Sequence, residues 1–240
     1  MSAAVVELSG VRFAWPGAPA PALDIGALSI ARGERVFVRG PSGSGKSTLL
    51  GLLAGVLVPQ AGEVRVLGRD IAKLSGAARD RSRADHVGFI FQMFNLIPYL
   101  SVVENVRLPC GFSRARRERA AAAGGSVDAE ARRLLAHLGL GDAALLRRPV
   151  TALSVGQQQR VAAARALIGA PELVIADEPT SALDAERRAD FLRLLFAECG
   201  RAGATLVFVS HDPALEPAFG RTLSMASLNR AASRAEGLAA

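Results

Sequence analysis

Residues 40–47, GPSGSGKS, have the types and spacing of a loop that binds phosphate groups. Glycines permit tight turns that point successive N–H groups at phosphate oxygens, and a helix beginning at the loop adds the positive end of its dipole. Lys46 would place its charge on the β- and γ-phosphates, and Ser47 would offer its hydroxyl to Mg²⁺. The predicted phosphate loop consists of Gly40, Pro41, Ser42, Gly43, Ser44, Gly45, Lys46, Ser47 and Thr48. It predicts a nucleotide site without separating ATP from GTP.

Two apolar elements flank this loop and would position it. Residues 36–38 (VFV) lead in as a strand, and four leucines at helical spacing, residues 49, 50, 52 and 53, lead out. Strand, glycine-rich loop and helix in this order are the context that the motif requires. The alternative is a loop of glycine and serine that matches the pattern by chance, and the flanking elements argue against it.

Two adjacent carboxylates, Asp177 and Glu178, follow the apolar run 173–176 (LVIA). The run predicts a strand that delivers both acids at its C-terminal end, where open α/β sheets place their ligands. We expect Asp177 to hold Mg²⁺ through water and Glu178 to act as the general base on the attacking water. The alternative is a pair of exposed acids that opens a turn before Pro179. With a phosphate loop on the same chain, hydrolysis of a nucleotide is the stronger interpretation.

Taken together, the motifs of this chain resemble those of the ATP-binding-cassette (ABC) ATPases. Residues 40–48 resemble the Walker A motif, and residues 173–178 resemble Walker B with its catalytic glutamate. Gln92 resembles the Q-loop glutamine, and His211 resembles the switch histidine. The segment that resembles the family signature is Leu153, Ser154, Val155, Gly156 and Gln157. The segment that resembles the D-loop is Ser181, Ala182, Leu183 and Asp184.

The resemblance implies a mechanism that needs two chains and uses ATP and Mg²⁺. In this family two cassettes pack head to tail, and each ATP lies between the Walker A loop of one and the signature helix of the other. A hydroxyl on Ser154 and a backbone N–H at Gly156 suit a γ-phosphate at a helix start. Val155 departs from the commoner glycine, which leaves a weakened clamp open as a possibility.

The same resemblance assigns the remaining site residues. Gln92 joins Ser47 and Asp177 as an expected Mg²⁺ contact, and Gln92, Glu178 and His211 form the expected catalytic set. Trp15 resembles the aromatic residue that stacks on adenine; a plain core tryptophan is the alternative.

Residues 85–98 and 101–106 resemble the lipoprotein-release, macrolide-efflux and cell-division group within the family. Their permeases have four membrane helices and a large extracytoplasmic domain. The apolar tract 93–100 is where such a permease would dock, and an ordinary buried turn is the alternative. The resemblance implies an exporter or mechanotransmitter whose cassette homodimer lies on the cytoplasmic face of the cell membrane.

The expected fold is α/β, a P-loop NTPase domain over residues 1–225 with a mostly parallel core sheet and N-terminal antiparallel strands. A helical subdomain is expected at about residues 93–152, including a flexible Arg- and Ala-rich excursion at 113–125 and a helix capped by Asp128. After one short strand beginning at Arg221, a polar tail is expected up to residue 240. The other expected strands are residues 5–15, 63–67, 87–91, 173–176 and 206–209.

Composition narrows the function classes. The chain has 240 residues, half of them apolar, and no apolar run long enough to predict a membrane span. The N-terminus does not resemble a secretory signal, and Cys110 and Cys199 are expected to be reduced thiols. The net charge of +7 comes from arginine, yet no aromatic residue interleaves with the arginines of residues 114–119. We therefore expect a solvated basic surface and no nucleic-acid partner, although the charge also suits an anionic membrane.

Two other functions remain as alternatives. One is a soluble ATP switch acting on ribosomes or DNA, but the chain has one phosphate loop, no heptad run and no cysteine cluster. The other is a cassette that binds ATP without hydrolysing it, against which Glu178 and His211 argue.

Overall fold

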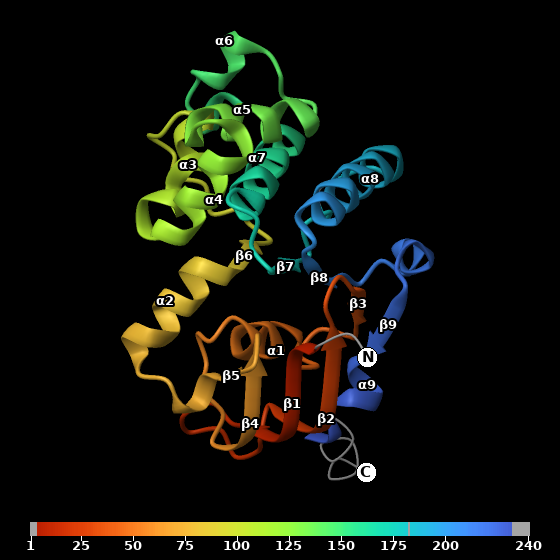
Figure 1. Cartoon of the computed structure of the whole chain (residues 1–240). Helices are drawn as coiled ribbons and strands as arrows, with labels where there is room; N and C mark the ends of the chain where they lie inside the picture. Colours follow the sequence, from red (N-terminus) through yellow and green to blue (C-terminus); the bar gives the residue numbers. More distant parts are fainter. Residues whose placement is uncertain (1–3, 182, 232–240) are drawn as a thin grey trace. The chain divides into compact units, whose positions relative to one another are not determined.

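The computed structural model describes residues 4–181 and 183–231, and the chain divides into two units. The first unit is Met1–Arg83 with Thr205–Ala240, and the second is Ala84–Ala204. Figure 1 shows that the C-terminal elements of the first unit lie with its N-terminal strands. Ala182, in the predicted D-loop, lies outside the described residues, as does the end of the predicted tail.

Alternating apolar side chains build an antiparallel sheet in the first unit. Along one strand Val6, Leu8, Val11 and Phe13 are buried, whereas the residues between them are mostly exposed, as a strand with one buried face requires. The strands follow the order β2-β1-β4-β5, and β2 forms an edge of this sheet. They are β1 (Ala4–Phe13), β2 (Leu23–Ala31), β4 (Ala61–Val66) and β5 (Arg69–Asp70).

Three parallel strands of the same unit carry the predicted phosphate loop. Their central strand pairs with one strand on each side, in the order β8-β3-β9. Continuous apolar runs form β3 and β8, and every residue of β8 is buried, which is typical of a parallel sheet covered on both faces. These elements are β3 (Arg35–Arg39), β8 (Thr205–Val209), β9 (Arg221–Ser224), and the helices α1 (Lys46–Leu53) and α9 (Met225–Leu228).

The second unit pairs two parallel strands and carries most of the helices. Ile90 at the end of β6 pairs with Ala176 near the end of β7, so both strands end at the same edge. Helices α3, α4, α5 and α7 pack on one another. The elements are β6 (Val87–Ile90), β7 (Leu173–Asp177), α3 (Val102–Phe112), α4 (Arg114–Gly124), α5 (Val127–His137), α6 (Ala143–Leu146), α7 (Val155–Leu167) and α8 (Ala185–Ala202).

The remaining elements connect these parts. Helix α2 (Gly76–His86) runs across the boundary at which the two units are divided. Short 3-10 helices occupy Ile71–Lys73, Val150–Ala152 and Pro213–Ala218. No helix in the described part of the chain is long and apolar enough to cross a membrane. Cys110 and Cys199 are both buried thiols.

The expectation of a flexible excursion at residues 113–125 is wrong, because most of it forms helix α4. Ser113 caps this helix by accepting a hydrogen bond from the Arg116 N–H, at 3.0 Å. The Arg116 side chain is buried and donates to the carbonyls of Ala166 (2.6 Å) and Ile168 (2.5 Å), which belong to the end of α7. Burial lowers the pKa of Arg116 to about 10. Arg116, which the sequence places in a solvated basic cluster, is therefore buried and donates hydrogen bonds to carbonyls at the end of α7.

The cap of the next helix also differs from the prediction. Ser126, rather than Asp128, caps α5, since its hydroxyl accepts from the N–H of Ala129 at 3.0 Å. Asp128 lies in the first turn, where its charge favours the helix dipole and pairs with Arg132 at 2.6 Å. The predicted short strand after Arg221 is confirmed as β9, and it is followed by α9.

Candidate functional site

The predicted phosphate loop joins the C-terminal end of β3 to the start of α1 within the first unit. Gly43 and Gly45 have φ angles of 79° and 94°, in the left-handed region that favours glycine. Gly45 is also the N-cap of α1, and it supplies no side-chain cap. A helix start without a side-chain cap, directly after a glycine-rich loop, is the arrangement of an anion site.

Lys46 is the first residue of α1, and its side chain reaches the beginning of the loop. Its Nζ donates to the carbonyl oxygens of Gly40 at 2.6 Å and Pro41 at 2.9 Å. Both partners are neutral backbone groups, so the ammonium charge is not compensated by a carboxylate in these two contacts. A phosphate oxygen at the loop would meet an ammonium already held in position.

Close contacts explain why two loop positions are glycine. A Cβ atom added to Gly40 would lie 2.6 Å from the Ser44 Oγ, and one added to Gly45 would lie 2.7 Å from Leu23 Cδ2. The Ser44 Oγ is itself buried without a hydrogen-bond partner, one of three such side-chain atoms among the described residues. The unpaired Ser44 hydroxyl and the lack of space for a Cβ at Gly40 both fit a loop that closes around a phosphate group.

Trp15 and His211 belong to the same unit as the loop. Trp15 is 49% exposed and packs edge-on against Phe13, with ring centroids 5.1 Å apart and an interplanar angle of 89°. The alternative of a core tryptophan is therefore wrong, and the indole retains exposed surface for stacking. His211 is exposed and follows the last residues of β8.

The paired acids lie in the second unit at the end of β7. Asp177 is the last residue of the strand and is half-buried, whereas Glu178 is buried, with 9% of its surface exposed. Glu178 has a φ of 46°, a left-handed backbone that a non-glycine residue adopts at a cost of about 1–3 kcal/mol. Such strained residues cluster at functional sites, which marks Glu178 as a candidate.

The predicted signature segment begins helix α7. The Ser154 Oγ accepts from the Gln157 N–H at 3.3 Å, and the Gln157 Oε1 accepts from the Ser154 N–H at 2.9 Å, which completes a capping box. Val155 is 49% exposed, so its side chain needs no space in the core. A Cβ added to Gly156 would lie 3.4 Å from Leu183, so this segment and the predicted D-loop are neighbours.

The D-loop segment opens helix α8. Asp184 is the N-cap of this helix and accepts from the Arg187 N–H at 2.9 Å. The Ser181 N–H donates to the Glu178 carbonyl at 3.3 Å, which links the segment directly to the strained glutamate. The predicted D-loop therefore continues from the paired acids without an intervening element.

Gln92 follows β6 and precedes a turn with an unusual backbone. Phe94 and Asn95 have φ angles of 58° and 49°. The guanidinium of Arg165, on α7, donates to the carbonyls of Phe94 at 2.5 Å and Asn95 at 2.6 Å. Burial lowers the pKa of Arg165, which is only 8% exposed. Sequence reasoning missed this residue, although an arginine among the buried alanines of α7 was a signal.

The tract 93–100 that follows Gln92 presents large side chains to solvent. Met93 is 80% exposed and Tyr99 is 83% exposed. The alternative of an ordinary buried turn is therefore wrong for these two residues. An exposed pair of this size, on a turn braced by Arg165, is a candidate contact surface.

The site residues divide between the two units. The phosphate loop, Trp15 and His211 belong to the first, and Gln92, the paired acids, the signature segment and the D-loop belong to the second. No group of three or more His, Cys, Asp or Glu side chains in the described residues is arranged to hold a metal ion.

Comparison with known proteins gives the family. The model of the ABC transporter family matches residues 23–181. The lipoprotein-releasing system ATP-binding protein LolD of Anaeromyxobacter dehalogenans is 45% identical over 88% of this chain and 85% of its own length. The macrolide export ATP-binding/permease protein MacB of Marinobacter nauticus is 44% identical over 78% of this chain, and the match spans only 27% of MacB.

Solved structures agree with this result. The dimeric ATP-binding cassette MJ0796, in a post-hydrolysis state bound to ADP and Pi, has a TM-score of 0.77 and 34% identity over 91% of this chain and 93% of its own. A second dimeric structure of MJ0796, described as a bacterial ABC transporter cassette, also has a TM-score of 0.77. The prediction of an α/β ABC ATPase is thus confirmed. The chain belongs to the ABC transporter family and is an ATP-binding cassette with ATPase function.

Proposed function

We propose that this ATPase dimerises on ATP and drives an integral-membrane permease from the cytoplasmic face of the cell membrane. LolD is named for a lipoprotein-releasing system, and the name of MacB joins ATP-binding and permease functions in macrolide export. Likeness to both supports an exporter or mechanotransmission system, in which the permease has four membrane helices and a large extracytoplasmic domain.

In this proposal the phosphate loop holds the nucleotide. The N–H groups at the start of α1 and the ammonium of Lys46 bind the β- and γ-phosphates, and Trp15 stacks on adenine. The observed cradle supports this role, because Gly40 and Gly45 leave no space for a side chain and Lys46 already lies over the loop. A phosphate oxygen replaces the carbonyls of Gly40 and Pro41 as the partner of Lys46.

The groups proposed for hydrolysis come from both units of the chain. Ser47, Gln92 and Asp177 hold Mg²⁺, which when bound neutralises charge on the phosphate oxygens. Glu178 takes the proton of the attacking water, and His211 hydrogen-bonds the γ-phosphate or that water. The strained backbone at Glu178 supports the assignment, since strained residues cluster at active sites.

The signature segment acts on the ATP held by the partner subunit. Ser154 and the N–H of Gly156 begin α7, where a helix N-terminus favours the γ-phosphate. The capping box orders this first turn before any ligand binds. Val155 is exposed, so we expect its side chain to be tolerated at the position where glycine is commoner.

The observation that supports coupling to a permease is the pair of hydrogen bonds from Arg165 to the turn at Phe94 and Asn95, between the exposed residues Met93 and Tyr99. Arg165 lies on the same helix that begins with the signature segment, and it holds the carbonyls of Phe94 and Asn95. A displacement of α7 is therefore transmitted by two charge-assisted hydrogen bonds to the surface that carries Met93 and Tyr99.

A pull-down from membranes tests the proposal. Tagged Glu178→Gln is purified with Mg-ATP from detergent-solubilised membranes of its own host, because slow hydrolysis should hold the closed dimer on its partner. We expect a multi-spanning membrane protein to be recovered. The double variant Met93→Ser/Tyr99→Ser in the same background should lose that partner. Recovery of ribosomal proteins or nucleic acid without a membrane protein would support the soluble switch instead.

A further inference from the structure

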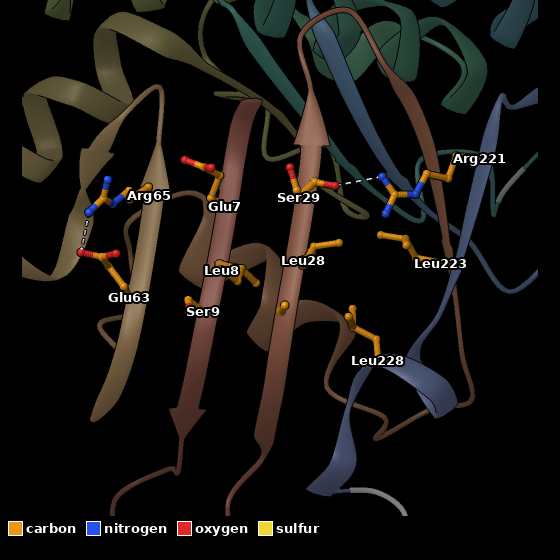
Figure 2. Close-up of a pocket in the computed structure, with 11 residues that line it drawn as sticks. Glu7, Leu8, Ser9, Leu28, Ser29, Glu63, Arg65, Arg221, Leu223 and Leu228 are labelled. Atoms are coloured by element: carbon orange, nitrogen blue, oxygen red, sulfur yellow. Dashed lines mark hydrogen bonds and ion pairs between the residues drawn. The ribbon is translucent and has the colours of Figure 1, made fainter. Parts of the chain in front are cut away.

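The C-terminal segment 221–231 packs closely on the strands and loop of the first unit. Leu223 on β9 pairs with Val38 on β3, and Arg221 donates to the Ser29 carbonyl on the edge strand β2 at 2.8 Å. Figure 2 shows Arg221, Leu223 and Leu228 along one side of a cavity of about 580 Å³, whose other side is formed by β1, β2 and β4. Both ends of the segment are therefore held against the antiparallel sheet.

Asn229 follows α9 and is the most heavily bonded side chain of this segment. It is only 2% exposed. Its Nδ2 donates to the carbonyls of Ala22 at 2.9 Å and Ser44 at 3.1 Å. Its Oδ1 accepts from the N–H groups of Asp24 at 2.9 Å and Ala231 at 3.1 Å. Both amide hydrogens and both oxygen lone pairs are thus used.

One of these partners, Ser44, lies inside the phosphate loop. Because a trans peptide is planar, its carbonyl and N–H point in opposite directions. Holding the Ser44 carbonyl toward Asn229 therefore directs the Gly45 N–H, within the same peptide plane, away from Asn229. Gly45 is the N-cap of α1, so this bond sets the direction of a donor at the helix start.

The loop needs such an external constraint. Gly43 and Gly45 flank Ser44, and glycines have the widest choice of backbone conformations. A second contact acts at the beginning of the loop, since a Cβ added to Gly40 would lie 2.8 Å from the Cβ of Met225. Met225 and Asn229 thus brace the loop at two points from the same C-terminal segment.

We propose that Asn229 is a positioning residue for nucleotide binding, which acts by fixing the peptide between Ser44 and Gly45. The proposal rests on the proposed role of residues 40–48 in holding the phosphates. The C-terminal segment 221–231 would thereby contribute to nucleotide binding.

Equilibrium titration with a fluorescent ATP analogue tests the proposal on the full chain. Asn229→Leu keeps the number and branching of the side-chain heavy atoms and removes all four hydrogen bonds, and we expect ATP affinity to fall about tenfold or more. Asn105→Leu is the matched control. Asn105 is also fully buried, and its amide donates to the carbonyls of Ile97, Leu100 and Ser101 within the second unit. This control should bind ATP as the wild type does.

Asn229→Asp provides a second test if the leucine variant does not fold. Its carboxylate would face the Ser44 and Ala22 carbonyls, so its affinity at about pH 8 should be reduced. Protonation at about pH 5.5 restores one donor and should recover part of the affinity, measured as a ratio to wild type at each pH. A merely structural amide would not give this pH dependence of binding in folded protein.

Lys46→Ala in the same titration distinguishes the role of the loop in phosphate binding from the positioning role of Asn229. If Lys46→Ala binds ATP normally, the proposed role of the loop is wrong. If Lys46→Ala loses binding while folded Asn229→Leu or Asn229→Asp binds within about twofold of wild type at all pH values, the positioning role alone is overturned.

Discussion

Arg165 on α7 holds the carbonyl of Asn95 with a hydrogen bond of 2.6 Å, across 70 residues of sequence. Asn95 has a left-handed backbone, and the same guanidinium also binds the neighbouring carbonyl of Phe94. The helix that begins with the signature segment is therefore joined to the turn that follows Gln92. The planar guanidinium of Arg165 donates to two carbonyls at once through two different nitrogens. The single ammonium of a lysine would not reproduce this geometry.

Replacing Arg165 should destabilise the protein. Arg165→Leu leaves two carbonyls without their donor, which costs about 1–3 kcal/mol in the free energy of unfolding. Urea denaturation measures this loss. Arg193→Ala is the control, because Arg193 is 70% exposed and its ion pair with Asp190 should contribute less than about 1 kcal/mol. Equal urea midpoints for Arg165→Leu and wild type would contradict the assigned role.

Lys46→Ala should remove ATP binding while the protein stays folded. The ammonium is the one side-chain charge that the phosphate loop offers, and its loss should weaken binding about a hundredfold or more. Titration with labelled ATP measures it. Lys73, the other lysine of the chain, is 76% exposed and pairs with Asp70 at 3.0 Å. Lys73→Ala should bind ATP normally; a similar loss in both variants would point to general charge rather than to the loop.

Ser154→Arg should leave ATP binding by a single chain intact and block ATP-driven dimerisation. The long cation would occupy the start of α7, where the partner's ATP is proposed to bind. The change also removes a helix cap, worth about 1 kcal/mol. Ser101→Arg is the matched control, because Ser101 forms the same capping box with Glu104 on α3. Only Ser154→Arg should elute as a single chain with ATP; a normal dimer in this variant would argue against the two-chain site.

Local motifs could be predicted from the sequence, because their residues are close in the chain. The strand before residue 40, the strand ending at Asp177 and the helix beginning after Ser154 each depend on neighbouring residues, and each is present. The bonds that connect distant segments could not be predicted. Asn229 binds Ser44 across 185 residues, and Arg116 binds Ile168 across 52. Nothing in the local pattern distinguishes either side chain from a solvated one.

The central claim is that two chains together hydrolyse ATP with Glu178 as the base. Light scattering after size exclusion, combined with an ATPase assay, tests it most directly on Glu178→Gln and wild type. We expect turnover by Glu178→Gln to fall by about a factor of 10² or more, since the amide cannot accept the proton. With Mg-ATP this variant should have the mass of two chains, and with Mg-ADP the mass of one. Retained turnover, or a single chain in both nucleotides, would contradict the account.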